Sequence, residues 1–298
     1  MSAYALTTPA LNERDRLPGL LEDLEAQQLR PSLWLVVDDG STDGTWEWLV
    51  EQAESRDWME VCPAPETSDE YLGGHVARIK RWGLEQVLAR AAELGLELFS
   101  VGVLDADLRL PVDHYRHLMD LLEADPELGV VSSVIRPEGG TEGRREPFQR
   151  EDLPRGGTQT FRLACLDEIG GLPPYAGFDG AANVKARLRG WRTRLATEVV
   201  ALHARPTATR FGVGPGYRRK GRYAWFLGLH PLVVVGRAAA FSLTSPHSGG
   251  FWFARGWLGA ALRREERCPD QEVRTYYGKE RPREYLRTLV GQGPRFAE

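Results

Sequence analysis

Two pairs of carboxylates in this 298-residue chain each follow a short apolar run. Asp38 and Asp39 follow the first run, and Asp105 and Asp107 follow the second. Ligands of open α/β sheets bind at the carboxyl ends of the strands, so both pairs are predicted at one sheet edge. The carboxylates of Asp105 and Asp107 repel each other unless a cation lies between them. This spacing suits Mg²⁺ or Mn²⁺ bridging carboxylate and phosphate oxygens.

Each pair also has a structural interpretation. The Asp-Gly-Ser-Thr sequence after Asp38 is common in loops, and Ser41 or Asp43 can cap a helix that begins near Thr45. Asp105 and Asp107 resemble helix-capping residues before a proline. Either interpretation would be favoured for one motif alone. The occurrence of both motifs at strand ends favours a nucleotide and metal site.

The elements around these residues alternate between strand and helix. Apolar runs at residues 3–7, 33–37 and 98–104 are predicted to be strands. Helical spacing of apolar residues predicts a helix with Leu17, Leu20, Leu21 and Leu24 buried, and a longer one over 73–94 with Val76, Ile79, Gly83 and Val87 on one face. This order predicts a mostly parallel α/β sheet with right-handed crossovers.

The charge of the chain changes sign along its length. Residues 1–200 hold 21 Lys and Arg against 35 Asp and Glu, whereas residues 201–298 hold 17 against 7. No acidic residue lies between Glu198 and Glu265. The apolar run at 223–235 is shorter than the ~20 residues of a spanning helix, and 251–258 combines aromatic residues with arginine. Two interpretations stay open, namely peripheral membrane contact and packing on the catalytic domain or in a homodimer.

The sequence also bears on nucleic-acid binding, disulfide formation and cellular location. The basic residues alternate with long apolar runs, and no zinc-finger or RNA-recognition signature is present, so no nucleic acid is expected. Cys62, Cys165 and Cys268 are far apart and odd in number, which is typical of a reduced protein without a disulfide framework. The chain enters a strand without a leader-like segment. We therefore expect a cytoplasmic protein that is either free or peripheral on the inner face of the membrane.

Four segments in order resemble the family 2 glycosyltransferases, which have the GT-A fold. They are the strand-to-loop segment 8–13, the turn 37–45, Asp105-Ala106-Asp107, and the stretch from Gly156-Gly157 to Asp179. The resemblance extends over roughly residues 3–205. The family commonly has Glu-Asp where this chain has Phe178-Asp179.

The resemblance implies a GT-A catalytic domain over 1–210, with a donor-binding half to about 110 and an acceptor half after it. A mainly helical basic extension over 211–298 would follow. It implies an inverting, metal-dependent transfer of a sugar from a nucleotide-diphosphate donor to a hydroxyl acceptor in a glycan, polysaccharide or lipid-linked molecule. The cofactor would be Mn²⁺ or Mg²⁺. Spanning helices and the Gln-x-x-Arg-Trp motif of processive synthases are not evident, which favours transfer of single sugars.

The candidate residues are assigned to four tasks. Asp179 would be the catalytic base, and the metal ligands would be Asp105, Asp107 and His203. Arg218, Arg219 and Lys220, after the glycine-rich residues 212–216, are predicted to form a mobile basic loop over the diphosphate, with a solvated turn as the alternative. A solvated arginine and a structural histidine are the alternatives for Arg78 and His203. The nucleotide-binding candidates are Pro9, Asn12, Glu13, Asp38, Asp39, Asp43, Arg78 and Asp105.

Two other functions were weighed. A nucleotidyltransferase of the same fold needs a glycine-rich triphosphate loop after the first strand, and residues 10–16 lack glycine. A catalytically inactive scaffold that binds sugar nucleotides would not need the Asp-x-Asp motif together with Asp179.

Overall fold

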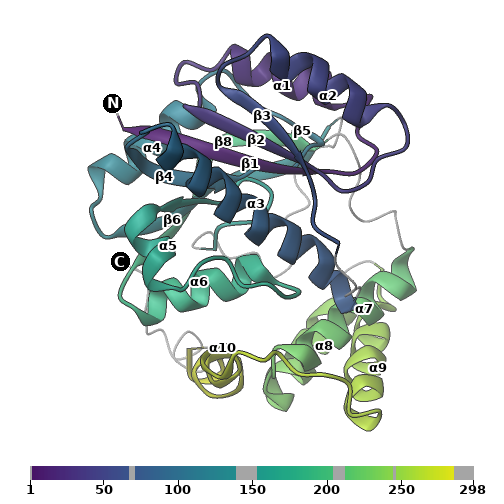
Figure 1. The fold of residues 1–298 in the computed structure, drawn as a ribbon. Helices are drawn as coiled ribbons and strands as arrows, with labels where there is room; N and C mark the ends of the chain where they lie inside the picture. Colours follow the sequence, from purple (N-terminus) through teal and green to yellow (C-terminus); the bar gives the residue numbers. More distant parts are fainter. Residues whose placement is uncertain (1, 67–70, 139–152, 204–211, 244–245, 285–298) are drawn as a thin grey trace. The chain divides into compact units, whose positions relative to one another are not determined.

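The computed structural model describes residues 2–66, 71–138, 153–203, 212–243 and 246–284 (Figure 1). The chain divides into two compact units. The first comprises Met1–Gly140 and Glu151–Arg205, and the second holds the remainder. Each unit is described by itself below.

An eight-stranded sheet forms the centre of the first unit, with the order β3-β2-β1-β4-β7-β6-β8-β5. The strands β1, β2, β3 and β4 pair in parallel, as do β6 and β8, which confirms the predicted mostly parallel sheet. The short strands β5 and β7 pair antiparallel with their neighbours. The strand bounds are β1 (Ala3–Ala10), β2 (Leu33–Asp38), β3 (Met59–Pro63), β4 (Leu98–Val103), β5 (Leu108–Arg109), β6 (Leu128–Pro137), β7 (Thr160–Arg162) and β8 (Arg192–His203).

Helices cover both faces of this sheet and enclose two apolar cores. Trp34 and Val36 of β2 point into one core, and Leu33, Leu35 and Val37 point into the other, because successive side chains of a strand face opposite sides. The helix bounds are α1 (Leu17–Glu25), α2 (Thr45–Glu54), η1 (Tyr71–Gly73), α3 (Gly74–Glu93), α4 (His114–Ala124), α5 (Leu163–Glu168) and α6 (Phe178–Leu188).

Two predicted helices can be compared with the structure residue by residue. The four leucines of α1 are buried as predicted. On α3, Ile79, Gly83 and Val87 are buried, but the prediction for Val76 was wrong, since its side chain is 47% exposed. The buried stripe of α3 is rotated slightly from the predicted one and includes Lys80.

The second unit is helical, as predicted. Its elements are α7 (Val213–Phe226), α8 (Pro231–Leu243), α9 (Gly249–Leu262), α10 (Gln271–Thr275) and the π-helical turn η2 (Tyr276–Glu280). Among the described residues, no helix combines the length and apolarity needed to cross a bilayer.

The predicted mobile loop at Arg218, Arg219 and Lys220 was wrong, because these residues lie within α7. The helix begins directly after Gly212, so the glycine-rich segment forms its first turn. Pro215 is compatible with this position, since the first-turn N–H groups of a helix have no partner inside the helix.

Candidate active site

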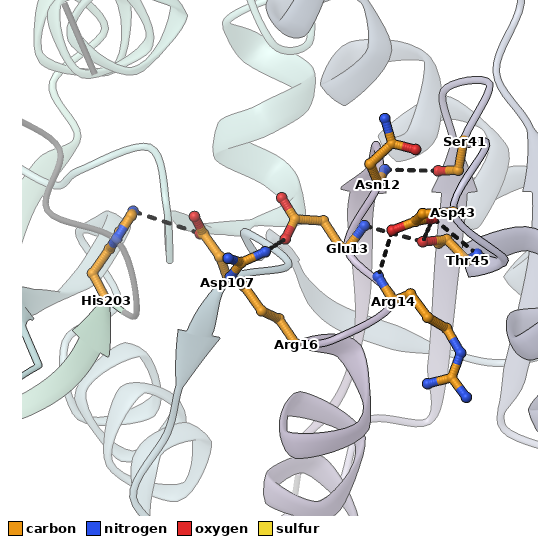
Figure 2. Close-up of polar contacts among 9 residues, drawn as sticks. All are labelled: Asn12, Glu13, Arg14, Arg16, Ser41, Asp43, Thr45, Asp107 and His203. Atoms are coloured by element: carbon orange, nitrogen blue, oxygen red, sulfur yellow. Dashed lines mark hydrogen bonds and ion pairs between the residues drawn. The ribbon is translucent and has the colours of Figure 1, made fainter. Parts of the chain in front are cut away.

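The loop after β1 and the turn after β2 are joined by hydrogen bonds (Figure 2). The Asn12 N–H donates to Ser41 Oγ at 2.9 Å, and the Thr42 N–H donates to Asn12 Oδ1 at 2.8 Å. The Glu13 N–H donates to Thr45 Oγ1 at 3.0 Å. Asn12 has a φ of 55°, a left-handed conformation that asparagine tolerates better than most residues. Hydrogen bonds therefore hold the two segments together at the carboxyl ends of β1 and β2.

Asp38 and Asp43 are engaged within this edge. Asp38 is buried, and its Oδ2 accepts from the N–H groups of Gly40 and Ser41 at 3.2 and 3.1 Å. Asp43 Oδ1 accepts from the Thr45 hydroxyl at 2.6 Å and from the Thr45 N–H at 3.0 Å. The hydroxyl bond, followed by bonds from backbone N–H groups, lowers the pKa of Asp43. Both carboxylates shape the turn, but the prediction that Ser41 or Asp43 caps the helix was wrong, because Gly44 is the N-cap of α2 and no side chain caps it.

Asp39 is oriented by a residue of α3. Its Oδ2 lies 2.6 Å from His75 Nε2, in a half-buried contact. Arg78, another nucleotide-binding candidate, lies one turn further along the same helix and is half-buried. The start of α3 therefore contributes His75 to the Asp39 turn, although the sequence singled out only Arg78 on this helix.

Asp105 forms an ion pair with a lysine that sequence reasoning missed. Lys80 Nζ lies 2.5 Å from Asp105 Oδ1 and donates to the carbonyl oxygen of Gly156 at 3.0 Å. The lysine side chain is 4% exposed, and its ammonium lies 4.9 Å from the centre of the Phe178 ring. The cation that the paired carboxylates require is therefore supplied at Asp105 by Lys80.

The Gly156-Gly157 turn links Asp105 with the start of α6. The Asp105 N–H donates to the Gly157 carbonyl oxygen at 2.9 Å. A Cβ atom at Gly157 would lie 2.9 Å from Asp105 Oδ2, and one at Gly156 would lie 3.2 Å from the Cβ of Asp179. Glycine at both positions permits this approach without crowding these side chains. The backbone thus brings the Asp105 carboxylate and Asp179 into one neighbourhood.

Asp179 lies in the first turn of α6. Its backbone oxygen accepts a hydrogen bond from Gln159 Nε2 at 3.3 Å, which fixes the start of the helix to the strand segment before β7. Its carboxylate has no hydrogen bond or ion pair to the described part of the chain. The side chain is half-exposed, which leaves it accessible to a substrate hydroxyl.

Asp107 and His203 meet through the pairing of β5 with β8. Leu108 pairs with His203 in this antiparallel ladder, and Asp107 comes directly before it. His203 Nε2 consequently lies 3.5 Å from Asp107 Oδ1 (Figure 2). Asp107 leads into a strand, so the helix-capping interpretation of the Asp-x-Asp motif was wrong.

The donor atoms of this pair fit a divalent cation of the Mn²⁺ type. A carboxylate and an imidazole suit such an ion, and both side chains are about 15% exposed. Within the described ranges, no group of three or more His, Cys, Asp or Glu side chains is arranged to hold a metal. Two protein ligands suit an ion that completes its coordination with phosphate oxygens and water.

The remaining candidates have separate positions. Pro9 lies near the end of β1, paired with Val37 of β2. Glu13 is buried and forms an ion pair with Arg16 at 3.0 Å. Arg218, Arg219 and Lys220 belong to the second unit.

The family model for glycosyl transferase family 2 matches residues 6–179, more than half of the chain. The matched region contains the Asp39 turn, the Asp-x-Asp motif and Asp179. The chain therefore belongs to glycosyl transferase family 2, and it is a glycosyltransferase.

Solved structures with the same fold include nucleotide-sugar enzymes. The mannosyltransferase PcManGT from Pyrobaculum calidifontis, in complex with GDP-Man and Mn²⁺, is 19% identical, with a TM-score of 0.60 over 89% of this chain and 88% of that chain. TarS 1-349 of S. aureus in complex with UDP-GlcNAc is 17% identical, with a TM-score of 0.53 over 88% of this chain and 76% of that chain. No curated protein matches the sequence. At these identities the similarity shows the GT-A fold and no specificity.

Proposed function

We propose that this protein is an inverting, metal-dependent glycosyltransferase that moves one sugar from a nucleotide-diphosphate donor to a hydroxyl acceptor. The observation that carries the proposal is the Gly156-Gly157 turn, which brings Asp105 of the Asp-x-Asp motif next to the start of α6, where Asp179 lies. Donor-side and acceptor-side carboxylates in one site are what direct transfer between two bound substrates requires.

On the donor side, Asp39 would hydrogen-bond the base or ribose, and the loop from Asn12 to Glu13 would line the same edge. Asp107 and His203 would hold Mn²⁺ or Mg²⁺. The ion, when bound, neutralises the charge that grows on the diphosphate as the bond to the sugar breaks. The solved complexes with GDP-Man and Mn²⁺ and with UDP-GlcNAc support a nucleotide-sugar donor.

On the acceptor side, Asp179 would take the proton from the attacking hydroxyl. The hydroxyl oxygen bonds to the anomeric carbon while the bond from that carbon to the donor phosphate oxygen breaks, and attack from the opposite face inverts the configuration. The proton remains on the Asp179 carboxylate, and the nucleoside diphosphate leaves. A positioned base of this kind contributes roughly 10²–10⁴-fold to the rate.

The test combines a panel of UDP-, GDP- and dTDP-sugars with the substitution Asp179→Asn. The wild type should be stabilised against heat by one donor with Mn²⁺, by about 2.7 kcal/mol at a hundred times the dissociation constant. The variant should keep this stabilisation, because the amide conserves volume, while sugar transfer falls by at least roughly 10²-fold.

Asp167→Asn is the matched control, since Asp167 is exposed on the neighbouring helix α5. Near-normal transfer by the Asp179 variant would show that the base is another residue. Donor binding without transfer to any hydroxyl acceptor in the wild type would instead favour a binding scaffold.

A further inference from the structure

The second unit has a buried apolar face and an exposed one. Phe241 of α8 and Phe253 and Ala260 of α9 are buried, and the two phenyl rings meet edge to face at 5.3 Å. These helices therefore have a core of their own. Six further large apolar side chains of α8 and α9 remain between 53% and 81% exposed, namely Leu232, Val235, Leu243, Phe251, Leu258 and Leu262.

The exposed residues of α8 form a stripe without charge. Leu232, Val235, Ala239 and Leu243 are exposed at helical spacings of three and four, with Gly236 and Ser242 beside them. A helix of a soluble protein normally places charged residues on this side. The exposed side of α8 is thus as apolar as a side that packs against a partner.

The exposed stripe of α9 combines apolar residues with arginine. Phe251, Leu258 and Leu262 share one side of the helix with Arg255, which is also exposed. Aromatic and aliphatic residues beside arginine are typical of helices that lie in the interfacial region of a membrane. We refer to the exposed residues of both helices as the apolar–basic surface, defined as Leu232, Val235, Leu243, Phe251, Arg255, Leu258 and Leu262.

The helices that carry this surface lie in a strongly basic part of the chain. Residues 199–264 contain no acidic side chain, and the exposed basic residues of α7 and of the end of α9 lie in the same unit. Within this range the cations with exposed side chains are Arg218, Arg219, Lys220, Arg255, Arg263 and Arg264, of which Arg263 pairs with Glu265 just after α9. A complementary partner therefore has an anionic surface above an apolar interior.

We propose that the apolar–basic surface docks on the face of a bilayer that contains anionic lipids. This inference goes beyond the proposed function and does not depend on the donor chemistry. Helices α8 and α9, of 13 and 14 residues, are shorter than the roughly 20 residues that span a bilayer, so they would lie in the plane of the interface.

A second copy of the chain fits this surface less well. A two-fold interface pairs a surface with itself. Two surfaces of like positive charge would then face each other, and Glu265, the first acidic residue after them, is already paired with Arg222 and Arg263. Lipid phosphates supply the missing negative charge.

Sedimentation of the full chain with phosphatidylglycerol–phosphatidylcholine vesicles and with phosphatidylcholine vesicles tests the proposal. The wild type should bind the anionic vesicles and be released as salt rises, because exposed charges are screened. Arg255→Gln should weaken binding about fivefold, the effect of one basic contact. The triple variant Phe251→Ser, Leu258→Ser, Leu262→Ser should weaken it by more than roughly tenfold.

Val112→Ser and Leu94→Ser are the controls, because these residues are exposed apolar side chains of the first unit. They should not alter vesicle binding. Equal binding to both vesicle types, or no binding, would overturn the proposal. Analytical ultracentrifugation tests the alternative of a dimer. If the wild type forms a dimer but does not bind vesicles, and the triple variant is monomeric, the surface would be assigned to contact with a second copy.

Discussion

Lys80 is buried, charged and bonded to two parts of the site at once. It holds the carboxylate of Asp105 and the carbonyl of Gly156, and so connects α3 to the turn before β7. Removing one partner of such a pair leaves the other polar groups without their bond. Lys80 is therefore a positioning residue for Asp105 rather than a group expected to touch the substrate.

We expect Lys80→Met to lower kcat/KM for the donor by about tenfold or more and to destabilise the fold by about 1–3 kcal/mol. Lys80→Arg should restore part of the activity, because the charge remains while the geometry changes. Steady-state kinetics of both variants, with separate kcat and KM, are the measurement. Lys185→Met on α6 is the control. A Met variant that loses stability but keeps wild-type kcat and KM would mean that the ion pair is purely structural.

The pair Asp107 and His203 leads to a second prediction at this scale. Asp107→Ala should remove the effect of Mn²⁺ on donor binding, and His203→Ala should weaken it by about tenfold, because each substitution deletes one of two neighbouring donors. Nucleotide titration calorimetry with and without Mn²⁺, together with the electron paramagnetic resonance of Mn²⁺, measures this without turnover. His117→Ala, at a half-exposed histidine of α4, is the control. Unchanged metal dependence in both variants would refute the assignment.

At the scale of elements, the second unit depends on close contact between α7 and α9. A Cβ atom at Gly221 would lie 2.0 Å from the carbonyl oxygen of Phe253, and one at Gly256 would lie 2.1 Å from that of Arg218. Both obstacles are backbone atoms, which cannot rotate away. Each of the two helices therefore has a glycine at the point where the backbone of the other helix comes close.

Gly221→Ala should consequently destabilise the second unit by about 1–3 kcal/mol, the usual cost of overpacking. Gly216→Ala on the same helix should be neutral or stabilise by up to about 1 kcal/mol, since nothing lies within 4 Å of the new methyl group and alanine favours helix. Denaturant unfolding of the full chain, followed by circular dichroism, compares them. Equal effects of the two substitutions would exclude the tight helix contact.

At the scale of the whole molecule, stability is expected to fall in acid. His114 is fully buried at the start of α4, with neither ring nitrogen hydrogen-bonded among the described residues. Burial, with a smaller contribution from His117, lowers the pKa of His114 to about 3. The unfolded chain binds a proton on this residue near pH 6.5, whereas the folded chain does not until about pH 3.

The free energy of unfolding should therefore decrease by up to about 1.4 kcal/mol for each pH unit between about 6 and 4 through this residue alone. Replacement by phenylalanine, His114→Phe, removes the titrating group and should reduce this slope whatever its effect on absolute stability. Urea unfolding at a series of pH values is the measurement, with His247→Phe at an exposed histidine as the control. An identical slope in the His114 variant would contradict the prediction.

The sequence by itself determined the family, the strands that lead to the acidic motifs, and the helical second unit. It could do so because apolar periodicity and turn residues act over a few neighbouring positions. The leucines of α1 and the two buried strands before Asp38 and Asp105 are examples. The first turn of α7 was misjudged because glycine and proline indicate a loop locally, although a helix also tolerates them at its first turn.

Tertiary structure alone decided which distant side chains meet. The Asp105–Lys80 pair depends on the rotation of α3 against the sheet, and the Asp39–His75 pair depends on where that helix begins. The Asp107–His203 contact depends on a two-residue antiparallel ladder between β5 and β8. Such contacts join residues far apart in sequence, and their geometry follows from the packing of whole elements, which no local pattern encodes.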